Sequence, residues 1–299
     1  MEQYIKLFDS LSDLTILEQE PLSRYTGFRT GGLGTVLIPQ NEASFVNTYK
    51  TIIGNSIPYY VLGNGSNVIA LDEGYDGVVL ITKKALNKVC VEDNRITAGA
   101  GLSLSEVCKT ALTHCLSGLE FAYGIPGSVG GAVYMNAGAY GSEICNVLSK
   151  VTYLDENGDY KEKDVTELEL AYRHSVFHDN KNWIVLSATF LLQDGEYSQI
   201  FAKMNELLNR RIEKQPLDYP SCGSTFKRPV GSYASKLIDE CGLKGFSLGG
   251  AAVSDKHAGF VINKNNATSK DILDLCRYVQ KTVKDNTGFD LELEVEFLK

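Results

Sequence analysis

The sequence has no long apolar run and no excess of positive charge. None of its 299 residues belong to a stretch of roughly 18 consecutive apolar positions, the minimum for a membrane-spanning helix. Residues 1–20 lack the basic and apolar regions of a secretory signal. The 37 acidic side chains outnumber the 29 basic ones, whereas nucleic-acid binders usually carry a basic surface. We therefore expect a cytoplasmic protein with neither a membrane nor a nucleic-acid partner.

Sequence patterns for disulfides and metal sites are also missing. The seven cysteines include no C-x-x-C pair, and the four histidines are dispersed, whereas zinc sites need closely spaced ligands. We expect reduced thiols and no bound metal. The cysteines are residues 90, 108, 115, 145, 222, 241 and 276, and the histidines are residues 114, 174, 178 and 257.

Two common nucleotide-binding motifs do not occur. The sequence has no G-x-x-x-x-G-K-[ST] phosphate loop. The stretch Gly63–Val68 is not G-x-G-x-x-G, because Val68 stands where the third glycine is required. These absences exclude a P-loop or a Rossmann fingerprint. The pattern G-x-S-x-G does occur, at residues 245–249, but the four histidines are dispersed along the chain, so we expect no Ser/His/Asp hydrolysis.

Glycine is the residue in conspicuous excess. Its 28 copies are about 9% of the chain against a usual ~7%, and they concentrate in a few short stretches where the backbone can approach a ligand closely. The chain length suggests two domains, and 43% hydrophobic residues are enough for a sizeable core. We therefore look for a ligand site at the glycine-rich stretches.

The first such stretch is the turn at residues 63–67. A strand near 36–38, a helix near 41–49 and a strand at 58–62 precede it. Successive backbone N–H groups in such a turn can converge on an anion. The alternative is a tight turn in which the Asn and Ser side chains satisfy their own backbone.

The second stretch, residues 124–141, contains six glycines and three alanines. Ser128 follows Pro126 and Gly127 and can begin a helix. The N-terminus of that helix, placed beside the first turn, could share a pyrophosphate with it.

The remaining pattern mixes helices and strands. We expect a short helix within residues 1–20, β-rich runs from 77 to 98, a helix at 103–116 and a hairpin at Asn157-Gly158. Helices are expected at 198–213 and 234–241, and another begins at Thr268 or Ser269 and ends at Gly288. Strict alternation predicts a strand over 289–297.

Local chemistry leaves several polar residues open to two interpretations. Arg173, between Tyr172 and His174, resembles any surface arginine. Ser224 lies on a turn next to two cations, which would favour a transient alkoxide, but a plain serine turn has the same pattern.

The acidic residues of the last strand and one lysine are equally ambiguous. Glu292, Glu294 and Glu296 share one face of the expected strand, and a solvated face explains them as well as a site does. Lys214 ends a helix and either complements the helix dipole or meets a substrate phosphate.

Six separate motifs, read together, resemble the type II branch of the UDP-N-acetylenolpyruvoylglucosamine reductase (MurB) family. The resemblance covers nearly the whole chain, and the order and spacing of the motifs make it specific. The motifs are residues 25–32, 62–68, 124–141, 172–173, 221–229 and 257–263.

The resemblance implies an α+β protein. Residues of about 28–193 would form a two-lobed FAD-binding unit of the vanillyl-alcohol-oxidase (PCMH) type, with lobes at 1–83 and 84–197, and residues 198–299 a substrate-binding α+β domain. FAD would be held without a covalent bond, its pyrophosphate on the two glycine-rich turns. The implied cofactor-binding residues are Gly63, Asn64, Gly65, Ser66, Asn67, Gly127, Ser128, Gly130, Gly131 and Ala132.

The implied reaction belongs to peptidoglycan precursor synthesis. NADPH reduces FAD, and flavin N5 then delivers hydride to the enolpyruvyl group of UDP-N-acetylglucosamine enolpyruvate, giving UDP-N-acetylmuramate. The addition leaves an enolate, which needs a stabiliser and a proton donor. By resemblance, Arg173 and Glu294 polarise the substrate carboxylate and Ser224 protonates the enolate. Residues implied in substrate binding are Tyr172, Lys214, Lys227 and Arg228.

The chain departs from the family pattern at one position, and two alternative functions remain. Many relatives carry Glu-Val-Arg where this chain has Glu294-Val-Glu296, which puts in doubt any substrate contact made from position 296. An FAD-dependent oxidase of the same superfamily is the enzymatic alternative. A flavin- or nucleotide-sugar-binding regulator without catalysis is the other.

Overall fold

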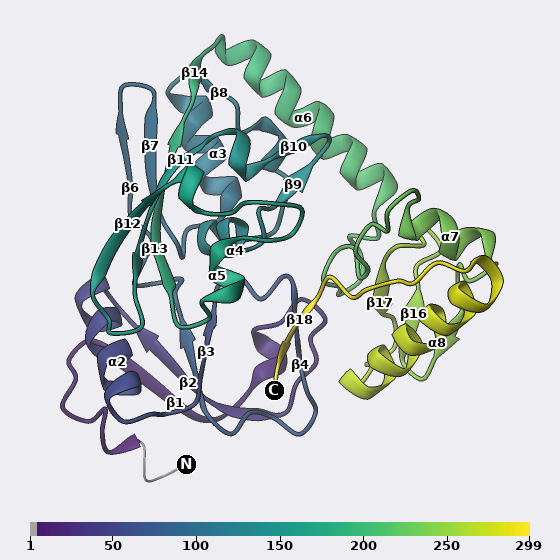
Figure 1. Cartoon of the computed structure of the whole chain (residues 1–299), viewed down its shortest axis with the longest axis horizontal. Coiled ribbons are helices and arrows are strands. Elements are labelled where there is room, and N and C mark those ends of the chain that lie inside the picture. Colours follow the sequence, from purple (N-terminus) through teal and green to yellow (C-terminus); the bar gives the residue numbers. More distant parts are fainter. Residues whose placement is uncertain (1–4) are drawn as a thin grey trace. The chain divides into compact units, whose positions relative to one another are not determined.

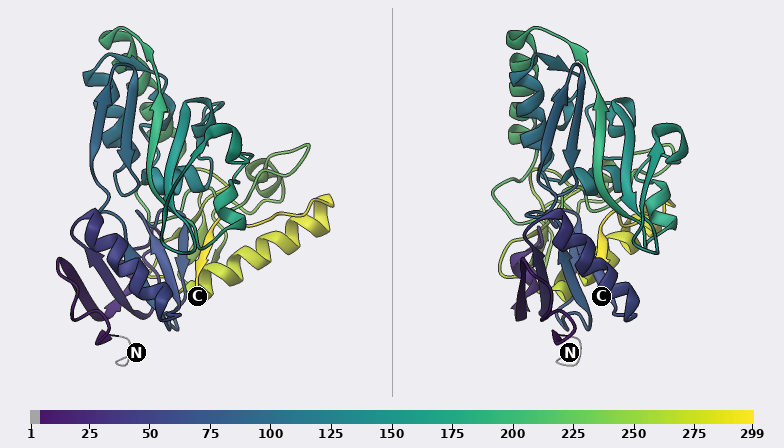
Figure 2. Two further views of the ribbon diagram at one scale, coloured as in Figure 1. Left: turned by 60° about the vertical axis from the view of Figure 1, so that its left-hand side comes forward. Right: turned by 90° about the vertical axis from the view of Figure 1, so that its left-hand side faces the viewer.

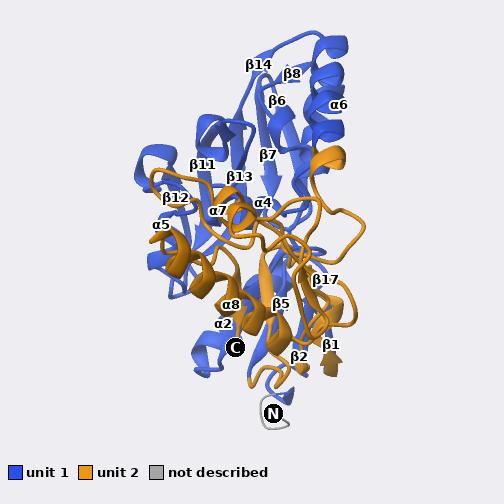
Figure 3. Cartoon of the chain, turned by 90° about the vertical axis from the view of Figure 1, so that its right-hand side faces the viewer, with its two compact units in different colours: residues 1–18, 35–64, 77–210 blue, residues 19–34, 65–76, 211–299 orange. Residues whose placement is uncertain are grey.

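The computed structural model describes residues 5–299 and divides into two compact units, each built from separate stretches of the chain (Figure 3). Unit 1 comprises the residues up to Glu18 together with Thr35–Asn64 and Gly77–Arg210. Unit 2 comprises Gln19–Gly34, Gly65–Asp76 and Arg211–Lys299. The first glycine-rich turn therefore contains a boundary between units, at residues 64 and 65.

The first sheet has the order β1-β2-β5-β3. Strands β2, β5 and β3 run parallel, so the expected strand–helix–strand order is present, with β5 inserted between the two strands. Helix α2 begins after Asn41, whose side chain accepts the Ser44 N–H, and lies along this sheet (Figure 2). The bounds are β1 Leu14–Pro21, β2 Leu33–Pro39, α2 Glu42–Gly54, β3 Tyr59–Leu62 and β5 Val78–Ile81.

The helix expected within residues 1–20 is wrong. Residues 14–21 form strand β1 beside β2, because pairing with a distant strand outweighs a weak local helical pattern. Residues 1–4 of that prediction lie outside the described residues.

A five-stranded antiparallel sheet follows, with the order β12-β11-β13-β7-β6. The Asn157-Gly158 turn joins β11 to β12 as predicted. Helices α3 and α4 pack against β7, and α4 also contacts β13 (Figure 1). The bounds are β6 Val89–Glu92, β7 Arg95–Gly99, α3 Leu104–Thr113, α4 Val129–Tyr134, β11 Leu148–Leu154, β12 Tyr160–Asp164 and β13 Ile184–Leu191.

Short elements complete unit 1. They are the pair β8 Leu116–Ser117 and β14 Gln193–Asp194, the hairpin β9 Gly138–Ala139 and β10 Ser142–Glu143, helix α5 Val176–Asp179, and the 3₁₀ turns Glu120–Ala122, Ile144–Asn146 and Val165–Glu167. Helix α6 Tyr197–Lys214 matches the prediction within one residue and continues past Arg210 into unit 2.

Unit 2 contains a three-stranded antiparallel sheet, β15-β16-β17, packed against α8, and α8 also contacts α7. Strand β4 pairs in parallel with β18 near the C-terminus. Helix α8 begins at the predicted cap Thr268 and ends at Gly288 with φ +79. The bounds are 3₁₀ turn Leu22–Arg24, β4 Val68–Ala70, α7 Ala234–Glu240, β15 Ser247–Leu248, β16 Ala251–Val253, β17 Val261–Asn263, α8 Ser269–Thr287 and β18 Glu296–Leu298.

The strand predicted over 289–297 is shorter in the structure. Only Glu296–Leu298 is a strand, while residues 292–294 pair with a loop through the isolated bridge Phe226–Leu293. The expected alternation is retained, since Leu291 and Val295 are buried. The extent differs because the partner β4 has three residues and the other partner is not a strand.

The architecture is α+β, as expected. Two separate hydrophobic cores exist, one in each unit. Within residues 5–299, no helix has both the length and the apolar character needed to cross a bilayer.

Candidate active site

The two glycine-rich stretches meet within unit 1. Asn64 Nδ2 donates to the Pro126 carbonyl at 3.1 Å across 62 positions of sequence. A Cβ added to Gly63 would stand 2.2 Å from Ser128 Oγ, so no larger residue fits at position 63. The end of β3 and the start of α4 thus form one surface, in the arrangement that the sequence suggested for a shared pyrophosphate.

The second part of the first turn lies in unit 2. Gly65 is buried with φ +61, and a Cβ there would stand 1.8 Å from the Tyr25 carbonyl oxygen. Its own carbonyl accepts the Gly27 N–H at 2.9 Å. The N–H groups of Asn64, Gly65 and Ser66 have no protein acceptor within residues 5–299. Consecutive N–H groups that donate to no protein atom can bind an anion when a tight turn points them the same way.

Helix α4 supplies the other half of the predicted cradle. Ser128 is 2% exposed and accepts the Gly131 N–H through Oγ at 3.3 Å. Gly131 is exposed, and a Cβ there would meet Ser128 Oγ at an ordinary 3.4 Å. The protein itself therefore does not require glycine at position 131, although glycine weakens a helix. Close approach of a bound group would account for glycine at this position, and a diphosphate-containing cofactor would fit these residues.

Arg173 occupies a two-residue turn of unit 1. The backbones of Ala171 and His174 exchange two hydrogen bonds of 3.1 Å and close the turn. Arg173 has φ +55, and its guanidinium lies 4.9 Å from the centre of the exposed Tyr172 ring. The turn thus presents Tyr172 and Arg173 together.

Asn136, which the sequence reasoning missed, links this turn to the second glycine-rich stretch. Its side chain is fully buried and donates to the Ala171 carbonyl at 3.1 Å and to Glu143 at 3.0 Å. Its Oδ1 accepts the Cys145 N–H at 3.0 Å. The signal in the sequence was an asparagine inside a stretch of small residues, but its bond to Ala171 spans 35 positions and could not be foreseen.

Ser224 and Glu294 lie on paired segments of unit 2. The Glu294 N–H donates to the Thr225 carbonyl at 2.9 Å, and the Lys227 N–H donates to the Glu292 carbonyl at 2.8 Å. Ser224 is exposed and directly precedes Thr225, which is completely buried. The fold thus brings the predicted proton donor and the predicted carboxylate onto neighbouring backbone.

Asn67 holds the other side of the Glu294 peptide. Its Nδ2 donates to the Glu294 carbonyl at 3.0 Å, and its own carbonyl accepts the Glu296 N–H at 2.9 Å. The sequence placed Asn67 among the cofactor-binding residues. In the structure its side-chain amide is directed to the segment just before β18 that carries Glu294.

The segment from His257 to Asn263 supports the Ser224 loop. The Thr225 N–H donates to the Gly259 carbonyl at 2.9 Å. Burial lowers the pKa of His257, which keeps the ring neutral near neutral pH, and Nδ1 then accepts the Gly259 N–H at 3.2 Å. Asn263 Nδ2 donates to the Phe28 carbonyl at 2.8 Å.

The basic residues predicted for substrate binding are mostly exposed. Lys214 is the last residue of α6. Lys227 lies 3.6 Å from Glu292, and the Arg228 guanidinium is 4.0 Å from the centre of the Tyr233 ring. These three cations and Ser224 all belong to unit 2.

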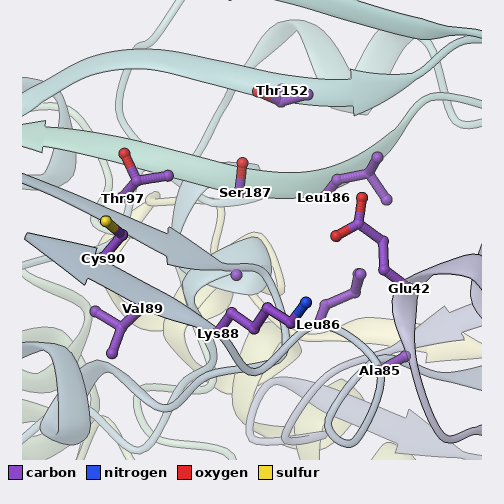
Figure 4. Close-up of a pocket in the computed structure, with 11 residues that line it drawn as sticks. Glu42, Ala85, Leu86, Lys88, Val89, Cys90, Thr97, Thr152, Leu186 and Ser187 are labelled. Carbon is purple, nitrogen blue, oxygen red and sulfur yellow. The ribbon is translucent and has the colours of Figure 1, made fainter.

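A cavity of about 430 Å³ lies elsewhere in unit 1, on the five-stranded sheet. Figure 4 shows Thr97, Thr152 and Ser187 on its strands, with Glu42 and Lys88 coming from other segments. None of the predicted site residues lines this cavity. It is therefore separate from the glycine-rich cradle.

Glu169, His174 and Asp179 form a group at the base of the Arg173 turn. Their ligand atoms lie within 4.8 Å of one another, and His174 Nε2 is 3.4 Å from Asp179. Both acidic residues are exposed to solvent. Spacing along the sequence had not indicated this group, because Glu169 and Asp179 approach His174 only once the turn is folded.

Comparison with known protein families identifies the class. Residues 34–163 match the model of an FAD binding domain, and together with the glycine-rich cradle this match defines an FAD-binding flavoprotein. Residues 215–298 match the C-terminal domain of UDP-N-acetylenolpyruvoylglucosamine reductase. The chain belongs to the UDP-N-acetylenolpyruvoylglucosamine reductase family.

Full-length relatives agree with this assignment. The chain is 50% identical to a reductase of this name from Clostridium perfringens (strain SM101), with 99% of this chain and 98% of the relative covered. It is 47% identical to one from Caldanaerobacter subterraneus, with 98% and 97% covered. The crystal structure of the enzyme from Thermus caldophilus superposes with a TM-score of 0.81 at 32% identity, covering 96% of this chain and all of that one.

The match confirms the family, the fold class and FAD as cofactor, all of which the six motifs had implied. It leaves the roles of individual residues as predictions.

The Gly131→Ala substitution tests the cradle. We expect the variant to fold at least as well as the parent, because alanine favours a helix by about 1 kcal/mol over glycine. Its affinity for FAD should fall by about tenfold or more, the effect of roughly 1.4 kcal/mol of steric loss. FAD titration of the apoprotein measures the affinity, and thermal unfolding measures the stability.

Gly54→Ala is the matched control, since Gly54 ends α2 and a Cβ added there would meet no other atom within 4 Å. It should be equally stable and bind FAD normally. Equal FAD affinity in the two variants would remove Gly131 from the cofactor site.

Proposed function

We propose that this protein reduces UDP-N-acetylglucosamine enolpyruvate to UDP-N-acetylmuramate with NADPH and FAD, a step of peptidoglycan precursor synthesis in the cytoplasm. Beside family membership, the observation that carries the proposal is the pairing of residues 225–227 with 292–294. That pairing supplies a hydroxyl and a carboxylate from adjacent backbone, as protonation of an enolate requires. An oxidase acting on another substrate has no use for this pair.

We propose further that the two glycine-rich turns hold FAD without a covalent bond. The contact of Asn64 with Pro126 and the small residues around Ser128 support this assignment. The residues concerned are Gly63, Asn64, Gly65, Ser66, Asn67, Gly127, Ser128, Gly130, Gly131 and Ala132. When bound, FAD accepts a hydride from NADPH and supplies it to the substrate.

The domain limits expected from the sequence remain part of the proposal. The four-stranded sheet is built from residues within 1–83, and the five-stranded sheet from residues within 84–197. Each of the two lobes would thus have its own sheet. Residues 198–299 would form the substrate domain, which includes α7, α8 and the sheet β15-β16-β17.

The residues act on the substrate as follows. Hydride adds to the terminal carbon of the enolpyruvyl double bond, and the electron pair of that bond moves to the carbon beside the carboxylate. Arg173 and Glu294 polarise the carboxylate, and the positive charge of Arg173 stabilises the enolate. The Ser224 hydroxyl gives its proton to this carbon and regains one from water, which reaches the exposed side chain. A hydroxyl is a weak acid, so it protonates only a strongly basic species such as the enolate.

Four further residues are proposed to hold the substrate. Lys214, Lys227 and Arg228 would bind the UDP diphosphate or the carboxylate, and Tyr172 stands beside Arg173. The ion pair of Lys227 with Glu292 is exposed and therefore weak, so a phosphate can replace the glutamate at little cost.

Anaerobic oxidation of NADPH by the purified flavoprotein tests the function. With UDP-N-acetylglucosamine enolpyruvate present, we expect many turnovers and one equivalent of UDP-N-acetylmuramate per NADPH. Without this substrate, flavin reduction should stop after one equivalent of NADPH has been oxidised. The same stop in the presence of the substrate would overturn the proposal and favour another substrate for the same fold.

Ser224→Ala should separate the two half-reactions. Reduction of the flavin by NADPH should remain near the parental rate, because this half-reaction transfers no proton to the enolpyruvyl substrate. Reoxidation by the enolpyruvyl substrate should slow by about 10²–10⁴-fold, the usual effect of losing a positioned proton donor. Stopped-flow absorbance measures both rates, and the exposed Ser247→Ala is the control. A parental rate of reoxidation would mean that another group donates the proton.

Glu294→Gln and Glu292→Gln compare two glutamates of the same segment. We expect Glu294→Gln to slow reoxidation by about tenfold or more, because it removes the carboxyl group that is proposed to polarise the substrate. Glu292→Gln should have an effect of about twofold or less, since its contact with Lys227 is exposed. Equal effects in the stopped-flow assay would show that Glu294 has been wrongly singled out.

A further inference from the structure

Thr225 is tied to two other segments of unit 2 by all three of its polar groups. Its N–H donates to the Gly259 carbonyl at 2.9 Å. Its Oγ1 accepts the Val261 N–H at 3.0 Å. Its carbonyl accepts the Glu294 N–H at 2.9 Å. Thr225, with 0% exposure, therefore connects the end of the Ser224 loop to β17 through its side chain and to the glutamate segment through its main-chain carbonyl.

The residues around Ser224 make it the outward-facing member of an anchored loop. Cys222, Thr225 and Phe226 are buried, whereas Ser224 is exposed. Cys222 Sγ donates to the Val68 carbonyl at 3.4 Å, and burial raises the pKa of its thiol to about 12. Anchors on both sides fix the backbone from which the serine hydroxyl projects.

Glu294 is fixed from two directions by the same network. Thr225 holds its N–H and Asn67 holds its carbonyl. The backbone positions of the donor and of the carboxylate thus both depend on one residue, Thr225, which is directly bonded to Ser224 and hydrogen-bonded to Glu294.

We propose that Thr225 is a positioning residue for the reduction of the enolpyruvyl group, and that its buried hydroxyl sets the spacing of Ser224 and Glu294 by binding the Val261 N–H. This inference rests on the proposed function. A valine at position 225 has nearly the same shape but no acceptor, so the buried Val261 N–H loses its partner and the loop must shift to restore one. A serine keeps the acceptor and loses one methyl group.

Thr225→Val and Thr225→Ser are therefore a matched pair. In Thr225→Val we expect reoxidation of the flavin by the substrate to slow by about 100-fold, the scale of a misplacement of about 1 Å. Reduction by NADPH and the dissociation constant of the substrate should change by less than about threefold, and Thr225→Ser should retain most of the parental rate. The thiol of Thr225→Cys is a weak acceptor, so its rate of reoxidation should lie between those of the other two variants. Thr225→Cys replaces Thr225→Val in this test if the valine variant does not fold.

A double-mutant cycle identifies the residue through which Thr225 acts. If Thr225 works by placing Ser224, then Thr225→Val should add little to the effect of Ser224→Ala.

Amide hydrogen exchange provides a readout that does not depend on activity. The Val261 and Glu294 N–H groups should exchange faster in Thr225→Val than in Thr225→Ser, while the N–H groups within α8 should be unaffected.

The outcomes separate this inference from the proposed function. A parental reoxidation rate in Thr225→Val, equal slowing of both half-reactions, or full additivity with Ser224→Ala would each overturn the positioning role. If Ser224→Ala and Glu294→Gln themselves react normally, the assignment of the catalytic residues fails instead. Loss of reoxidation in Thr225→Val, with rescue by serine and faster exchange at Glu294, supports the inference.

Discussion

The hydrogen bond from the Glu294 N–H to the Thr225 carbonyl is the constraint on which the substrate side of the site depends. It joins two segments about 70 residues apart, each carrying one of the residues proposed to act on the substrate, Ser224 and Glu294. Neither segment is a regular strand at this point, and one neighbouring backbone bond, from the Lys227 N–H to the Glu292 carbonyl, supports it. Its precision comes from the buried side chains next to it, above all Thr225 and Phe226.

Glycine serves two different purposes in the cofactor half of the site. At Gly63 and Gly65, the neighbouring protein atoms leave no room for a side chain. At Gly131 the protein leaves room for a side chain, and in our proposal the bound FAD is what excludes one. A count of glycines in the sequence cannot separate these cases, because the difference lies in what approaches each Cα from distant parts of the chain.

Local signals made much of the fold predictable from the sequence. The Thr268 cap and the Gly288 stop delimit α8, and Asn157-Gly158 marks a hairpin, since each depends on neighbouring residues. Strand β1 and the true extent of β18 were missed because their pairing partners are remote. The catalytic candidates were ambiguous by local chemistry and were selected by resemblance. Asn136 and Thr225 were not foreseen, because their importance comes from bonds to segments that only folding brings near.

The interleaving of the two units has a consequence for synthesis on the ribosome. Strand β4, at residues 68–70, pairs with β18, at residues 296–298. The partner of β4 is thus synthesised 228 positions after it, and the edge of β4 stays unpaired until then. Contacts so distant in sequence form slowly, and an exposed strand edge favours aggregation. Unit 2 can be completed only after β18 has been made, so deletion of Glu296–Leu298 would affect a strand far earlier in the chain.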